Sequence, residues 1–152
     1  MTNELWTILI SASPIVELRG AIPVAIGAFQ FSPTKAYLLA VLGNAAPIIP
    51  LLFFLRKFSN YLMRHNYYFN QFFNWLFERT RRQHTKKFEI WGSIVLFSFT
   101  AIPFPLTGVW SACLAAFVFG VDFWKAAGFI SLGAAAAGVI VLGTTLGIIN
   151  II

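Results

Sequence analysis

The sequence has little of what soluble and secreted proteins depend on, because it holds one cysteine and few charged residues. Cys113 is the only cysteine, so the chain can form no internal disulfide and no cysteine-based metal site. Charged residues make up 11% of the 152 residues and hydrophobic ones 59%. A soluble domain carries about 25% charged and about 45–50% apolar residues. Since the apolar residues lie in long uncharged runs, the composition indicates an integral membrane protein.

The sequence also lacks the groupings of residues that form common catalytic and cofactor sites. It has no paired carboxylates and no glycine-rich phosphate loop after a strand. The two histidines, His65 and His84, have no neighbouring carboxylates at metal-ligand spacing. We therefore expect no metal, no cofactor and no enzymatic activity. An intramembrane enzyme that uses Glu17 as its base is the weaker alternative.

The positive charge is concentrated in one segment. Between Arg56 and Lys87 lie eight basic residues and one acidic residue, Glu78, whereas the rest of the chain sums to −1. One basic segment between apolar runs is typical of a cytoplasmic loop, because lysine and arginine resist translocation. Its interleaved aromatic residues indicate helices that lie in the membrane interface. This predicts a multi-pass protein of the cytoplasmic (inner) membrane with no nucleic-acid partner, and an anionic-lipid or nucleic-acid patch is the alternative.

The uncharged runs predict the membrane elements. Ala36–Leu55 has 20 residues without a charge and Ala126–Ile152 has 27, so each is long enough to span the bilayer. Ile90–Val121 has 32 uncharged residues, but Pro103–Gly108 at its centre cannot continue an α-helix. The arms on either side are too short to span, which predicts a re-entrant hairpin.

The N-terminal run has the same form. Leu5–Val16 and Ile22–Thr34 are its arms, and Glu17–Ala21 is its predicted break. Broken backbone at membrane depth is tolerated only inside protein or beside water, so both breaks should lie within the molecule. Two kinked spans, giving a four-span protein, are the alternative.

Four short segments recur in order along the chain and indicate an internal repeat. They are Ala21-Ile22-Pro23 with Ala101-Ile102-Pro103, Ala28-Phe29-Gln30-Phe31 with Ala116-Phe117-Val118-Phe119, Lys35-Ala36 with Lys125-Ala126, and Gly43-Asn44-Ala45-Ala46 with Gly133-Ala134-Ala135-Ala136. On this alignment the second copy is longer by ten residues.

The repeat predicts an all-α integral membrane fold of one domain, with repeat one at 4–55, a basic linker at 56–88 and repeat two at 89–152. Each repeat is a re-entrant hairpin followed by a transmembrane helix. Because each repeat crosses the membrane once, the second is inverted relative to the first, and the two hairpin turns meet near the midplane.

Glu17 and Arg19 are the only charged residues inside the first hairpin. Charges at membrane depth are costly and commonly mark pathways or proton relays. Burial and a nearby guanidinium act in opposite directions on the pKa of a carboxyl group, which suits a proton carrier. A purely structural ion pair is the alternative.

The second turn offers hydroxyl groups, free backbone groups and an aromatic ring. The predicted substrate and proton pathway consists of Glu17, Arg19, Gly20, Pro23, Thr100, Pro103, Pro105, Thr107, Gly108 and Trp110.

The last span carries a GxxxG motif at Gly143 and Gly147. Such small residues allow helices to approach closely. They predict either packing inside the protomer or contact between two copies in a homodimer.

Two of these segments resemble a known family. Glu17-Leu18-Arg19-Gly20-Ala21-Ile22-Pro23 and Ala101-Ile102-Pro103-Phe104-Pro105-Leu106-Thr107-Gly108-Val109-Trp110 are similar to motifs of the small multidrug export family, related to the DedA/VTT membrane proteins. The resemblance covers nearly the whole chain and implies two re-entrant hairpins in inverted repeat. DedA relatives are associated with proton-dependent translocation of lipid carriers, including polyprenyl phosphates, and with lipid scrambling. DedA proteins carry arginines in the second hairpin, where this chain has none.

Together these patterns predict a transporter or lipid translocase, linked to protons, with its site between the two hairpin turns. Its expected partners are membrane lipids, protons and a small amphipathic or lipid-phosphate substrate. A membrane scaffold or assembly factor that does not transport is the main alternative.

The charge asymmetry and the crossing count yield a testable topology: the basic linker is cytoplasmic and both termini face outward. Single cysteines in the variants Asn3→Cys, Asn70→Cys and Asn150→Cys, each combined with Cys113→Ala, can be probed with an impermeant thiol reagent on intact cells. We expect labelling at positions 3 and 150 only. Labelling of position 70 from outside would contradict the topology.

Overall fold

A computed structural model describes residues 2–81, 86–102, 108–149 and 151, and these residues form α-helices without any strand. The all-helical class is therefore confirmed for this part of the chain. The helices are α1 (Asn3–Ala12), α2 (Glu17–Gly27), α3 (Pro33–Ala45), α4 (Ile48–His65), α5 (Tyr67–Arg81), α6 (Lys86–Ala101), α7 (Val109–Val118) and α8 (Phe123–Ile149).

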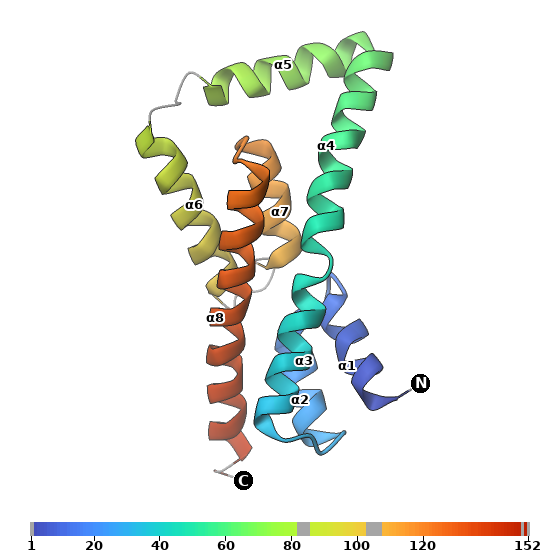
Figure 1. The fold of residues 1–152 in the computed structure, drawn as a ribbon, viewed down its shortest axis with the longest axis vertical. Helices are drawn as coiled ribbons and strands as arrows, with labels where there is room; N and C mark the ends of the chain where they lie inside the picture. Colours follow the sequence, from blue (N-terminus) through green and yellow to red (C-terminus); the bar gives the residue numbers. More distant parts are fainter. Residues whose placement is uncertain (1, 82–85, 103–107, 150, 152) are drawn as a thin grey trace.

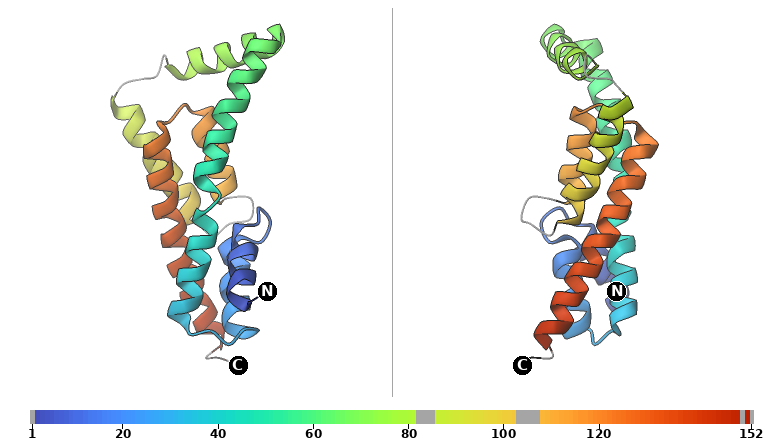
Figure 2. Two further views of the ribbon diagram at one scale, coloured as in Figure 1. Left: turned by 45° about the vertical axis from the view of Figure 1, so that its right-hand side comes forward. Right: turned by 90° about the vertical axis from the view of Figure 1, so that its left-hand side faces the viewer.

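Two short helical pairs occupy opposite ends of an elongated bundle (Figure 1). The α1–α2 pair lies in the lower half of the view, and the α6–α7 pair lies in the upper half. The helices α3 and α4 follow one another along the full length of the molecule, and α8 runs back beside them. The two further views agree with this arrangement (Figure 2). The helix α5 lies across the upper end of the bundle.

The break in the first pair is not at Glu17–Ala21, as predicted from the sequence, but at Ser13–Val16. Ser13 has an extended backbone (φ −69°, ψ 143°), because the residue before a proline, here Pro14, avoids the α-helical region. The Ser13 N–H and hydroxyl both donate to the carbonyl of Ile10 and hold this end of α1. The α2 helix then begins at Glu17 and continues through Pro23.

The matched segments of the predicted repeat differ in where they lie. Ala101 ends α6, whereas Ala21-Ile22-Pro23, to which its segment was matched, lies inside α2. These two segments therefore do not occupy equivalent positions of their helices. Lys35 and Lys125 both lie in the first turn of their helices.

Two helices are long and apolar enough to cross a membrane, namely Pro33–His65, which joins α3 and α4, and Phe123–Ile149. The predicted span Ala36–Leu55 is interrupted at residues 46–47. Pro47 has no N–H to donate to the carbonyl of Gly43 four residues earlier, so the regular helix stops there. The helices α1, α2 and α7 have 10, 11 and 10 residues. Each is roughly 15 Å long, about half of a hydrocarbon core.

Two glycines allow the first helix of each pair to lie directly on a long helix. A Cβ at Gly43 of α3 would lie 2.6 Å from the carbonyl oxygen of Ile8 in α1. A Cβ at Gly133 of α8 would lie 2.8 Å from the carbonyl oxygen of Phe97 in α6 and 2.7 Å from the Thr100 Cβ. Both positions therefore exclude any larger residue unless the backbones separate.

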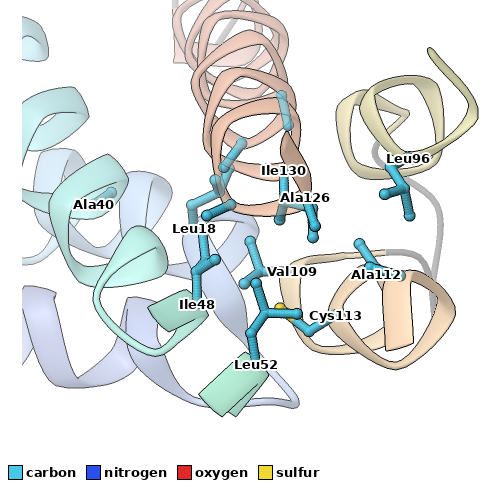
Figure 3. Packing of buried hydrophobic residues seen from close by; sticks show 14 of the residues in the cluster. Leu18, Ala40, Ile48, Leu52, Leu96, Val109, Ala112, Cys113, Ala126 and Ile130 are labelled. Atoms are coloured by element: carbon cyan, nitrogen blue, oxygen red, sulfur yellow. The ribbon is translucent and has the colours of Figure 1, made fainter. Parts of the chain in front are cut away.

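The hydrophobic core lies where the inner ends of both pairs meet α4 and α8 (Figure 3). Its fully buried side chains include Leu18, Ile48, Leu96, Val109, Cys113 and Ile130. No described atom lies within 4 Å of a Cβ built at Gly143 or Gly147. These two glycines therefore do not mediate helix packing among the described residues of the protomer, which was one of the two predicted uses.

The glycine contacts predict that a change from glycine to alanine affects the free energy of unfolding differently at two positions of α8. Gly133→Ala should lower the free energy of unfolding by about 1–3 kcal/mol, because the new methyl group overlaps the α6 backbone. Gly128→Ala is the matched control, since open space surrounds that position. It should be neutral or stabilising by up to about 1 kcal/mol through helix propensity. Thermal unfolding in detergent measures both, and equal effects would contradict the close α6–α8 contact.

Candidate functional site

The carboxylate of Glu17 lies at the N-terminus of α7 and joins the two helical pairs. It accepts hydrogen bonds from the backbone N–H groups of Val109 and Trp110. Both carboxylate oxygens lie against the Cα of Gly108, where any Cβ would collide with them. The Glu17 residue is 8% exposed. An anionic group is stabilised at this end of a helix, where unpaired N–H groups and the helix dipole present positive charge.

Two further hydrogen bonds connect the pairs beside this carboxylate. The Trp110 indole Nε1 donates to the carbonyl of Ala12 at 3.2 Å. The Arg19 Nη2 donates to the carbonyl of Ile102 at 3.5 Å. Each of these bonds therefore reaches a carbonyl at the C-terminal end of the first helix in the other pair. The carbonyls at such an end have no N–H donor within their own helix.

The local backbone directs Glu17 toward α7. Glu17 has a φ of 54°, in the left-handed region that costs a residue other than glycine about 1–3 kcal/mol. Gly20, one turn later, is in close contact with the side chain of Val16, so a larger residue there would push the turn open. The turn thus holds the carboxylate in place through a backbone conformation that is unfavourable for glutamate.

The arrangement can respond chemically to a proton. The ionised carboxylate attracts the α7 N-terminus and the neighbouring Arg19 guanidinium. Protonation removes that charge and weakens both attractions at once. Among the described residues no three His, Cys, Asp or Glu side chains come together, so none of them is assigned to a metal.

The structure brings together five of the predicted site residues: Glu17, Arg19, Gly20, Gly108 and Trp110.

Two others lie apart from this group. Thr100 is buried, donates its hydroxyl to Leu96 and packs on Gly133. Pro23 is exposed, six residues along α2 from Glu17, which is about 9 Å along the helix. The predicted site residues Pro103, Pro105 and Thr107 lie outside the described residues.

The sequence interpretation missed Asn44 as a site residue. Asn44 is 2% exposed, and its Oδ1 is buried without a hydrogen-bond partner among the described residues. The signal was present in the sequence, because Asn44 and Tyr37 are the only side chains with polar groups in the run Ala36–Leu55.

Asn44 faces the first helical pair. Ala40, one turn earlier, accepts a hydrogen bond from the Ser11 hydroxyl through its carbonyl. Ile48, one turn later, lies in the same core cluster as Leu18. Asn44 therefore sits between these contacts, next to the helix interruption at Pro47. A buried amide oxygen without a described hydrogen-bond partner thus lies three residues before the proline that interrupts the helix.

Replacing Asn44 tests whether this oxygen serves function or stability. A buried acceptor without a partner costs about 1–3 kcal/mol, so Asn44→Leu should raise the thermal unfolding temperature in detergent. It should at the same time lower flux in proteoliposomes. Asn3→Leu makes the same change at an exposed position and should alter neither. A lower unfolding temperature for Asn44→Leu would show that the amide is structural.

Comparison with known proteins gives one match. No curated protein and no solved structure matches the chain. A protein-family model described as "Putative small multi-drug export protein" matches residues 17–140, a range that begins at Glu17 and extends from α2 into α8. With its two long apolar helices, this indicates a membrane protein of the transport class. The chain belongs to the small multi-drug export protein family.

Proposed function

We propose that the protein is a proton-linked transporter of the inner membrane, with its site where the two helical pairs meet. The observation that carries the proposal is the Glu17 carboxylate, buried and hydrogen-bonded to the first N–H groups of α7. Membership of an export family supports a transporter in general. A carboxylate that bridges the two helical pairs gives a proton the means to change their contact.

The proposed topology is an inverted repeat of re-entrant hairpins. Its support is that α1–α2 and α6–α7 occupy opposite ends of the bundle (Figures 1 and 2). Several of these helices are also too short to cross a bilayer. Gly43 and Gly133 make similar contacts in the two halves, each against the first helix of its pair. The basic linker would then lie on the cytoplasmic side.

The proposed cycle has two states of Glu17. In the ionised state the carboxylate attracts the α7 N-terminus and Arg19, and the hairpin turns stay together. Protonation weakens these attractions, so the turns separate and a path opens beside Asn44 and the break at Pro47. The proton and the substrate then leave on the opposite side as the turns close again.

The proposed substrate is a small amphipathic molecule or the phosphate head of a lipid carrier. Once Glu17 is protonated, the Arg19 guanidinium no longer faces a charged carboxylate and can bind an anionic head. The lipid alternative follows from the proposed relation of the small multidrug export family to the DedA/VTT proteins.

We also propose that α8 contacts a second copy of the chain. Its Gly143 and Gly147 are exposed and have no described atom within 4 Å of a Cβ built there. Small residues at this spacing are common where two membrane helices cross.

Substitution of Glu17 tests the mechanism. Glu17→Gln keeps the volume and one acceptor but cannot carry the proton, so the flux into proteoliposomes should fall at least about tenfold and lose its pH dependence. Candidate lipids and cationic drugs serve as substrates, with a fluorescent reporter of internal pH. Thermal unfolding in detergent verifies that the variant is folded.

Glu4→Gln is the matched control, because it makes the same chemical change at a surface pair. The Glu4 carboxylate lies 2.6 Å from Lys35 Nζ, and both side chains are exposed. This variant should transport with the wild-type pH profile. A folded Glu17→Gln protein that also keeps the wild-type profile would end the proton mechanism and leave the fold unaffected.

A further inference from the structure

A pocket of about 390 Å³ lies between α4 and the start of α8, away from the hairpin contact. Its lining combines two aromatic rings with polar and basic groups: Phe53, Arg56, Lys57, Asn60 and Phe123. Among the described residues, no acidic one lines it. The pocket therefore offers an apolar wall and a positively charged wall to one ligand.

The Arg56 guanidinium is held in place at this pocket. Its Nη2 donates to the carbonyl of Val121 at 2.9 Å. Its Cζ lies 5.4 Å from the centre of the Phe123 ring. Arginine has five N–H donors in a planar fork that matches the oxygens of a phosphate. A guanidinium that is already oriented loses less side-chain entropy when it binds such a group.

Lys57, which is basic, and Asn60, which is polar, complete the wall that Arg56 begins; we call it the basic wall. The Lys57 Nζ lies 5.9 Å from the centre of the Phe53 ring, and Asn60 lies one turn beyond Arg56 on α4. Asp122 directly precedes Phe123 of the pocket in the sequence. Its carboxylate accepts hydrogen bonds from the backbone N–H groups of Trp124 and Lys125. It thus caps α8 and does not line the pocket.

The pocket lies at the boundary between apolar and charged sequence. The uncharged run of α4 ends at Leu55, and the basic segment begins at Arg56. Phe53 and Phe54 are 60% and 57% exposed, as expected for side chains in contact with lipid. The helix α5 lies across this end of the bundle (Figure 1). In a bilayer the basic wall would be level with the lipid headgroups, and the phenylalanines would be level with the first acyl carbons.

We propose that this pocket binds an anionic phospholipid of the surrounding membrane. Arg56, Lys57 and Asn60 hold its phosphate, and Phe53 and Phe123 contact its glycerol and acyl chains. This lipid occupies a site of its own, so the proposal does not rest on proton-linked transport. It links α4 to the start of α8 at the end of the bundle opposite the α1–α2 pair.

The test uses native mass spectrometry to compare how tightly different lipids bind to the purified full-length chain in detergent. Dioleoyl phosphatidylglycerol should bind at least about tenfold more tightly than dioleoyl phosphatidylcholine, because both carry a phosphate but the choline ammonium of the second lipid would lie beside Arg56 and Lys57, which repel it. Lys57→Gln should weaken binding of phosphatidylglycerol by about tenfold. Lys57 is exposed on α4, so this variant keeps the fold. Arg56→Gln should weaken it further.

Arg64→Gln is the charge-matched control, because it removes the same charge from α4 outside this pocket. It should bind phosphatidylglycerol as the wild type does. Equal losses for Lys57→Gln and Arg64→Gln would overturn the proposal in favour of general attraction to the basic segment. Glycerol 1-phosphate binding as tightly as the lipid would also overturn it, since the site would then take free phosphates.

Discussion

The fold depends on one constraint, which is that each broken helix must find partners for its exposed backbone groups inside the protein. A hydrocarbon core has no water to supply them. The first N–H groups of α7 receive the Glu17 carboxylate, and the last carbonyls of the α1 and α6 ends receive Trp110 and Arg19. The two helical pairs thus complete one another, because each break also receives a hydrogen bond from the opposite pair.

Close packing of backbones serves the same constraint. Gly43 and Gly133 let α1 and α6 lie on the long helices with almost no side chain between them. This shortens the distance between the first helix of each pair and the long helix beneath it. The Glu4–Lys35 ion pair, in contrast, lies at the surface of the described part of the chain.

Much of this fold could be predicted from uncharged runs, prolines and the charge asymmetry. The all-helical class, the two long apolar helices and the meeting of Glu17 and Trp110 follow from these patterns. The position of the first break did not, because Glu17 and Arg19 were taken to interrupt a helix that Ser13 and Pro14 end. A proline acts locally through sterics, whereas a charge inside a helix is tolerated once tertiary contacts receive it. The role of Asn44 depends on burial, which a sequence does not display.

The hairpin contact has an unusual chemical asymmetry: one partner is a side chain and the other is backbone. The N–H groups of Val109 and Trp110 are present whatever residues stand there, proline excepted. If the charge at position 17 changes, no substitution in α7 can restore the lost attraction, because the partners there are backbone groups. A substitution of Gly108 could respond only to a change in the size of side chain 17. Correlated substitutions across a set of related sequences would thus be weak at this contact, so a map of coevolving positions would understate the interaction on which the two halves depend.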